Sequence, residues 1–338
     1  MSADVAVSLA VLVGVVALSD VIRRPLCGLL AGTSMRAYAA ELVSTFQLCC
    51  CTHELQLLSE VGVVPAGVSL TLTYLAAVTH GLTFRGATGN PIGTLAHAYR
   101  ARISGVSALL RIACQFAAAR AARAAVQVIW GRGLSGLHAR HALSGFRCAS
   151  AIRAPLHAAA CVELACAFAV QTAVTHARGL RDRYRVHATA AVITSVVCAG
   201  GSVTGAVFNP ALAFSTLFGC TGSSTAEYCV VYWVGPLLAR FCHSSCRNGV
   251  LCADLRQSVS SVTIGRHEEE VRHQQHVTGR AQTTRRRQLY VTFFPPVDCN
   301  LKKVMAISGH FIRYKSCQKA VQNYSAGVPK LCPLRATD

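Results

Sequence analysis

Two short stretches decide the fold: Gly89-Asn90-Pro91-Ile92 and Phe208-Asn209-Pro210-Ala211. Asn is a favoured N-cap of helices. Pro is favoured at the first helical position, because its missing N–H would have no partner there anyway. Each stretch is followed by a short apolar run, residues 92–98 and 211–218, about two helical turns long. The two stretches therefore predict two short helices that begin inside apolar sequence.

The two stretches occupy equivalent places in an internal repeat. Glu41 lies in an apolar segment upstream of Asn90, and Glu163 lies in another at nearly the same distance upstream of Asn209. Each half is predicted to contain a helix with a buried Glu, a second helix, a loop, an Asn-Pro half-helix and a third helix. Because three spans is an odd number, the halves must be inverted relative to each other. Inverted repeats place the functional path at their interface near the bilayer midplane.

Composition indicates a membrane protein. The 338 residues are 52% hydrophobic and only 14% charged, whereas a soluble domain usually carries about 25% charge. An ordinary soluble enzyme is therefore disfavoured. The net charge of +19 would suit nucleic acid or an anionic membrane surface, and the position of most arginines between apolar blocks favours the membrane.

Seven apolar segments are candidates for membrane-spanning helices, which need about 20 residues. They are residues 5–22, 38–58, 64–84, 103–130, 156–176, 187–200 and 227–242. The fourth contains three arginines, which must lie near an interface or face the bundle interior because an exposed charge in the membrane is costly. We expect the first segment to be an uncleaved anchor. Its charged pair Arg23-Arg24 follows the apolar core, whereas a cleaved signal peptide carries its positive charge before the apolar core.

Arginines in the short loops predict the orientation. Residues 23–37, 85–102 and 178–186 are rich in arginine and are expected on the cytoplasmic side, whereas 59–66 contain none. The loop 131–155 has four arginines and departs from this pattern.

The predicted fold class is an all-α membrane protein, an inverted repeat of three helices plus one reentrant half-helix per half. Residues 1–35 form an N-terminal apolar anchor and a basic linker. Residues 36–242 form the channel domain, with halves 36–130 and 156–242. Residues 243–338 form a basic tail that is expected to be largely disordered.

The predicted site is the point where the two half-helices meet. Their N-termini would direct two partial positive charges and two amide donors, from Asn90 and Asn209, at one place near the midplane. Such a site offers hydrogen bonds to a neutral solute and opposes cations, including protons moving along a water chain.

Several stretches resemble the aquaporin (major intrinsic protein) family. They are GSVTGAVFNPA at 201–211, AELVSTF at 40–46, YWVGP at 232–236 and the cysteine-rich helix 44–60, which is similar to the unorthodox intracellular branch. The resemblance covers roughly residues 36–239. It implies a channel of six helices and two half-helices that passes water, with glycerol or hydrogen peroxide as further candidate solutes. It also implies a homotetramer in the endoplasmic reticulum membrane, with the plasma membrane as the alternative, and no cofactor or metal.

The resemblance also assigns roles to individual residues. Asn90 and Asn209 would be the pore donors, Pro91 and Pro210 the half-helix caps, and Ile92 and Ala211 the third motif positions. Glu41 and Glu163 would hold the reentrant loops. The selectivity constriction would be formed by Leu70, Val197, Ala206 and Leu212. Water-selective members carry an Arg where this sequence has Leu212, so an apolar constriction tolerant of glycerol is expected.

The sequence is also compatible with other functions. The chain could be a non-conducting aquaporin-like protein whose basic tail binds anionic lipid or a partner, and no nucleic acid is expected because no such fold motif is present. An ion-coupled transporter would need more charged residues within the spans. A zinc enzyme is disfavoured, because Leu57 stands where a His-Glu-x-x-His site starting at His53 needs its second histidine.

Of the 17 cysteines, those in apolar runs are expected to be packed thiols: Cys49, Cys50, Cys51, Cys161, Cys166 and Cys198.

Overall fold

The computed structural model describes residues 3–60 and 63–247. Apart from one isolated β-bridge between Ala149 and Thr221, the regular elements in these ranges are helices. They are α1 (Ala3–Leu29), α2 (Met35–Leu58), α3 (Ala66–Thr83), α4 (Pro91–Tyr99), α5 (Gly105–Gly131), α6 (Gly136–Leu143), α7 (Leu156–His176), η1 (Ala177–Gly179), α8 (Asp182–Thr204), α9 (Pro210–Thr216), α10 (Thr225–Cys229), η2 (Val230–Val234) and α11 (Gly235–Arg247).

All seven candidate spans are helical. In this part of the chain, three helices are long and apolar enough to cross a membrane on length and composition alone: α1, α8 and the stretch Leu156–Gly179. The helices α2 and α5 are long as well, but they carry charged side chains within their apolar sequence. The last helical run continues to Arg247, past the boundary predicted at 242. The predicted tail lies outside the described residues from 248 onward.

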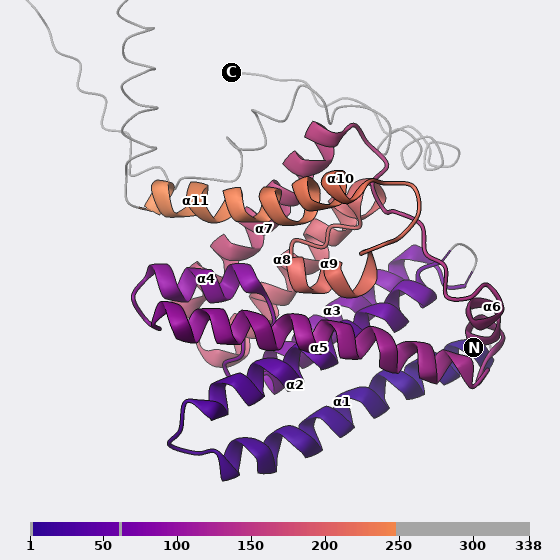
Figure 1. Cartoon of the computed structure of the whole chain (residues 1–338), viewed down its shortest axis with the longest axis horizontal. Helices are drawn as coiled ribbons and strands as arrows, with labels where there is room; N and C mark the ends of the chain where they lie inside the picture. Colours follow the sequence, from indigo (N-terminus) through magenta and orange to yellow (C-terminus); the bar gives the residue numbers. More distant parts are fainter. Residues whose placement is uncertain (1–2, 61–62, 248–338) are drawn as a thin grey trace, which may run out of the picture. The chain divides into compact units, whose positions relative to one another are not determined.

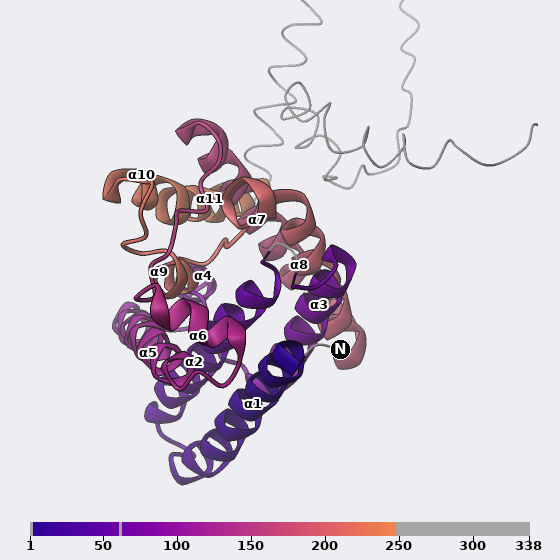
Figure 2. The same ribbon diagram turned by 90° about the vertical axis from the view of Figure 1, so that its right-hand side faces the viewer.

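Two sets of helices follow the same order along the chain, α2-α3-α4-α5 and then α7-α8-α9-α10-η2-α11. Within the sets, α2 packs against α5 and α7 against α11, while α3 packs along α8. Figures 1 and 2 show the short helices α4 and α9 between α2 and α5 on one side and α7, α10 and α11 on the other. Their Asn-Pro ends therefore lie among the longer helices.

The helix α1 lies outside this pattern and packs against α2. Its Arg23, predicted to follow the apolar segment, lies inside the helix and is fully buried. The guanidinium donates to the carbonyl of Thr83 at 2.7 Å and to the side-chain oxygen of Gln47, and it lies 3.6 Å from a carboxylate oxygen of Asp20. These bonds attach α1 to α2 and α3.

The packing between α2 and α5 uses small side chains. Cys49 and Cys50 of α2 meet Ala119 and Ala122 of α5 in one buried cluster. Small residues let helix backbones approach closely, which is how helices associate where lipid removes the hydrophobic driving force. The short side chains of the cysteine-rich helix therefore serve packing.

The prediction about packed thiols holds for some cysteines and is wrong for others. Cys49, Cys50, Cys51 and Cys166 are buried as free thiols. Cys161 and Cys198 are exposed on the described surface instead, because their positions on α7 and α8 face away from the neighbouring helices.

Gly235, the first residue of α11, tests the packing of α11 against α7. A Cβ added there would lie 2.9 Å from the backbone carbonyl oxygen of Ala160 in α7, which cannot rotate away. We expect Gly235→Ala to lower the free energy of unfolding by about 1–3 kcal/mol through overpacking. The matched control is Gly14→Ala in α1, where nothing lies within 4 Å. Thermal aggregation of the detergent-solubilised protein, followed by size exclusion, measures both; equal midpoints would contradict the contact.

Candidate functional site

The two Asn-Pro turns are the N-termini of α4 and α9. The side-chain oxygen of Asn90 accepts from the backbone N–H of Ile92 at 2.9 Å. That of Asn209 accepts from Ala211 at 3.1 Å and from Leu212 at 3.3 Å. In each helix Pro91 or Pro210 follows the cap at the first position, so the local rules for helix starts apply at both turns.

The amide groups of the two asparagines cross over to the opposite turn. The Asn90 Nδ2 donates to the carbonyl of Phe208 at 3.2 Å, and the Asn209 Nδ2 donates to the carbonyl of Gly89 at 2.8 Å. Each amide therefore binds the residue that directly precedes the other asparagine. The two helix N-termini, where the partial positive charges of the backbone lie, are brought to one place.

The backbone before each asparagine is in an unusual conformation. Gly89 has φ +57°, and in the second turn Ala206 and Phe208 have φ +47° and +40°. The left-handed region is unfavourable for residues that have a Cβ, and such residues persist only when their surroundings fix them. The second turn in particular needs support from elsewhere in the molecule.

Glu41 of α2 supplies that support to the first turn. Its fully buried carboxylate accepts the backbone N–H of Thr88 at 2.9 Å and that of Gly89 at 3.0 Å. The Thr88 hydroxyl donates to it at 3.1 Å, and Gln115 Nε2 of α5 donates at 2.9 Å.

Glu163 of α7 does the same for the second turn. It accepts the backbone N–H of Val207 at 3.0 Å and of Phe208 at 2.5 Å, and the Thr204 hydroxyl at 2.6 Å. The hydroxyl of Tyr232, in the π-helical turn η2, donates to the carbonyl of Thr204 at 2.8 Å. The roles of Gln115 and Tyr232 were not predicted from the sequence. The only signal was a polar group within an apolar helix.

The four predicted constriction residues lie on three elements and a loop. Ala206 is buried in the second turn, while Leu212 lies in the first turn of α9 and packs against both hydrophobic clusters. Leu70 and Val197 are half-buried on α3 and α8, which pack together. Their convergence on one constriction stays a prediction. The third motif positions, Ile92 and Ala211, are buried.

Comparison with known proteins identifies the family. No protein-family model matches the chain. It is 40% identical to aquaporin-11 of Homo sapiens over 202 residues, which are 60% of this chain and 74% of that protein. It is 34% identical to aquaporin-12 of Mus musculus over 239 residues, 70% of this chain and 82% of that protein. The chain belongs to the aquaporin family. It is therefore a multi-pass membrane channel protein and not an enzyme, as predicted.

The fold agrees with that assignment. The X-ray structure of the aquaglyceroporin from Plasmodium falciparum matches this aquaporin with a TM-score of 0.53 at 13% identity. The match covers 67% of this chain and all of the other. At that identity the likeness shows the fold alone.

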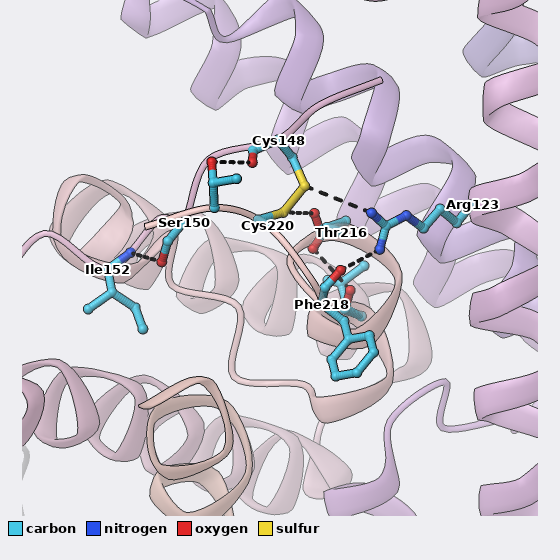
Figure 3. The surroundings of a disulfide bond; sticks show 9 residues. Arg123, Cys148, Ser150, Ile152, Thr216, Phe218 and Cys220 are labelled. Carbon is cyan, nitrogen blue, oxygen red and sulfur yellow. Dashed lines mark hydrogen bonds between the residues drawn. A yellow bond between two sulfur atoms is a disulfide. The ribbon is translucent and has the colours of Figure 1, made fainter. Parts of the chain in front are cut away.

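A disulfide fixes the far end of α9 in this aquaporin (Figure 3). Cys148, between α6 and α7, is bonded to Cys220, four residues after α9. Ser150 N–H donates to the Thr221 carbonyl at 2.7 Å, and Thr221 N–H donates to the Cys148 carbonyl at 3.0 Å. The loop before α7 is thereby attached to the segment that follows the second Asn-Pro helix.

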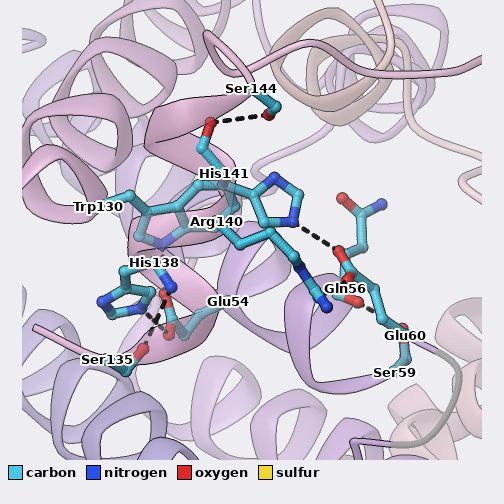
Figure 4. Close-up of polar contacts among 10 residues, drawn as sticks. All are labelled: Glu54, Gln56, Ser59, Glu60, Trp130, Ser135, His138, Arg140, His141 and Ser144. Atoms are coloured by element: carbon cyan, nitrogen blue, oxygen red, sulfur yellow. Dashed lines mark hydrogen bonds and ion pairs between the residues drawn. The ribbon is translucent and has the colours of Figure 1, made fainter. Parts of the chain in front are cut away.

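A second polar cluster holds α6 of the aquaporin against α2 and α5 (Figure 4). Buried Glu54 accepts from Trp130 Nε1 at 2.8 Å and pairs with His138 Nε2 at 2.9 Å. Glu60 contacts Arg140 and His141 at 2.5 and 2.7 Å.

The residues that the structure describes contain no group of three or more His, Cys, Asp or Glu able to hold a metal. His53 binds the hydroxyl of Ser215 instead.

The carboxylate of Glu163 offers a direct test of loop support. Glu163→Gln keeps the side-chain volume but replaces one acceptor oxygen with an NH2 group facing backbone N–H donors. We expect the free energy of unfolding to fall by at least about 2 kcal/mol. A buried donor left unpaired costs about 1–3 kcal/mol, and a charged hydrogen bond is lost as well.

The control for this variant is Glu227→Gln, which changes an exposed carboxylate in the capping box of α10. Thermal midpoints of the solubilised proteins compare the two. A midpoint of the Glu163 variant no lower than that of the Glu227 variant would show that the second turn does not depend on this carboxylate.

Proposed function

We propose that this aquaporin is a passive channel for water and small neutral solutes, with glycerol and hydrogen peroxide as candidates. The observation that supports this best is the crossed pair of bonds between Asn90 and Phe208 and between Asn209 and Gly89. An amide NH2 has two N–H bonds. One is used for the opposite turn, and we assign the second to a solute passing between the turns.

The charge pattern at the turns favours neutral solutes. Two helix N-termini and two amide donors make the narrow region electropositive, and the carboxylates of Glu41 and Glu163 are occupied by backbone N–H groups. A pore of this kind binds the oxygen of a water or an alcohol and opposes cations and protons.

The proposed constriction carries no fixed charge. All four side chains are apolar: Leu70, Val197, Ala206 and Leu212. They offer no side-chain hydrogen bond that would favour a single water molecule over a larger polyol. We infer that selection there is by width and that glycerol is admitted more readily than in a pore narrowed by a charged side chain.

The proposed topology is an inverted repeat in which α4 and α9 enter the membrane from opposite sides and meet at its midplane. Disulfides form in oxidising compartments, so the Cys148–Cys220 bond supports a lumenal or extracellular position for the loop 131–155 despite its four arginines. We propose the endoplasmic reticulum membrane as the location and, from the family, a homotetramer as the assembly.

Replacing the second pore donor tests the proposal. Asn209→Asp keeps the capping oxygen but removes the amide donor and introduces a buried carboxylate. We expect water flux, measured by stopped-flow light scattering on proteoliposomes of the full chain, to fall by more than about tenfold, because an unpaired buried charge costs several kcal/mol. Gln56→Glu, the same chemical change at an exposed position, should leave flux unchanged. Equal flux in both variants, from protein shown to be folded, would refute the pore assignment.

The constriction can be tested through solute choice. Leu212→Ala should raise the glycerol-to-water permeability ratio several-fold, because it removes apolar bulk where we place the narrowest apolar ring. Leu217→Ala, just after the same short helix, makes an equal deletion away from that ring at a position that is buried, whereas Leu212 is half-buried. Both lower stability by about 2–5 kcal/mol. An equal ratio in the two variants would place the constriction elsewhere.

A further inference from the structure

A charged cavity lies between α5 and the end of α9, apart from the Asn-Pro turns. Its volume is about 220 Å³, and it is lined by Arg120, Arg123, Gln127, Phe214 and Phe218. The three polar residues are spaced three, four and seven apart on α5, so they share one face of that helix.

This cavity is not the proposed pore. Leu212, which we place at the constriction, and Phe214, which lines the cavity, are two residues apart on α9, and side chains at that spacing do not share a face of a helix. The aromatic wall is fixed by its own contacts: Phe214 and Phe218 lie 5.1 Å apart between ring centroids, and Phe116 meets Phe214 edge-on. The cavity is therefore a formed site separate from the proposed constriction, although Leu212 and Phe214 both also pack against the cluster that contains Cys49.

Among the described residues, no carboxylate pairs with the two positive charges of this cavity. Arg123 Nη1 donates to the carbonyl of Phe218 at 2.6 Å, and its Nη2 lies 3.8 Å from the sulfur of Cys148 (Figure 3). Arg120 is exposed and forms no hydrogen bond or ion pair within residues 3–60 and 63–247. Neither α5 nor the stretch 210–223 contains a carboxylate. The ligand that suits these two guanidiniums is an anion with several acceptor oxygens, because a guanidinium binds such an anion through paired N–H groups.

The depth of the cavity identifies the source of that anion. On the proposed function, Asn209 lies at the bilayer midplane, and the last residue of α9, Thr216, follows it by a rise of about 10 Å. The hydrocarbon half-thickness is about 15 Å, so the cavity lies in the outer part of the lumenal leaflet. Long arginine side chains extend from there toward the lipid headgroups, while the phenyl rings face acyl chains. We propose that this cavity binds the phosphate of an anionic lipid in the lumenal leaflet.

Native mass spectrometry of the full chain tests the site. Protein extracted in detergent with equal amounts of phosphatidic acid and phosphatidylcholine should retain phosphatidic acid preferentially. In Arg120→Gln this retention should fall about fivefold, the change expected from removing one cation near an anionic lipid. Arg120→Lys should keep most of it. The matched control is Arg132→Gln, an exposed arginine at the end of the same helix, which should retain as much as wild type.

Two results would count against the proposal. Equal retention by wild type, Arg120→Gln and Arg132→Gln would overturn it. Displacement of phosphatidic acid by millimolar glycerol phosphate would show that a soluble phosphate ester, not a lipid, occupies the cavity. Water flux is not part of this readout: a chain that conducts nothing but loses lipid only in Arg120→Gln would refute the proposed function and leave the lipid site standing.

Discussion

The two Asn-Pro turns can lie among the helices because a buried carboxylate accepts the backbone N–H groups that precede each of them. Without water, an unpaired backbone group costs several kcal/mol, and irregular backbone at membrane depth needs protein around it. Glu41 and Glu163 each satisfy two such groups, and they also fix residues whose φ is positive. Once these segments are fixed, the asparagines can cap their own helices and bind the opposite turn.

The two halves support their carboxylates by different means. In the first half Gln115 of α5 donates directly to Glu41, whereas in the second half Tyr232 donates to the carbonyl of Thr204, whose hydroxyl binds Glu163. Tyr232 lies in a π-helical turn, a local widening that often marks a functional position in a helix. Equivalent backbone geometry is thus reached with different side chains, so similarity between the halves is clearer in the Asn-Pro turns than in the helices that support them.

The sequence predicted the features of the fold that depend on neighbouring residues alone. The seven helices follow from the length of apolar blocks, and the starts of α4 and α9 follow from the capping chemistry of Asn and Pro. It did not predict the Cys148–Cys220 bond, the burial of Arg23 or the bonds of Gln115 and Tyr232. Each of these joins residues far apart in the chain, and a residue's own neighbours in sequence carry no signal of such a partner.

Two buried or half-buried arginines show how this fold tolerates charge in apolar surroundings. Arg23 donates to the carbonyl of Thr83, the last residue of α3, and Arg123 donates to that of Phe218, just beyond α9. Carbonyls at the end of a helix have no partner within it and carry its partial negative charge, and the Phe218 carbonyl lies two residues beyond such an end. A buried guanidinium on one helix and unpaired carbonyls at the end of another therefore satisfy each other, and each lowers the free-energy cost of burying the other. The short helices α4 and α9 end inside the molecule and so create such ends beside longer helices. The helix α5 can carry Arg123 next to apolar side chains because α9 ends beside it.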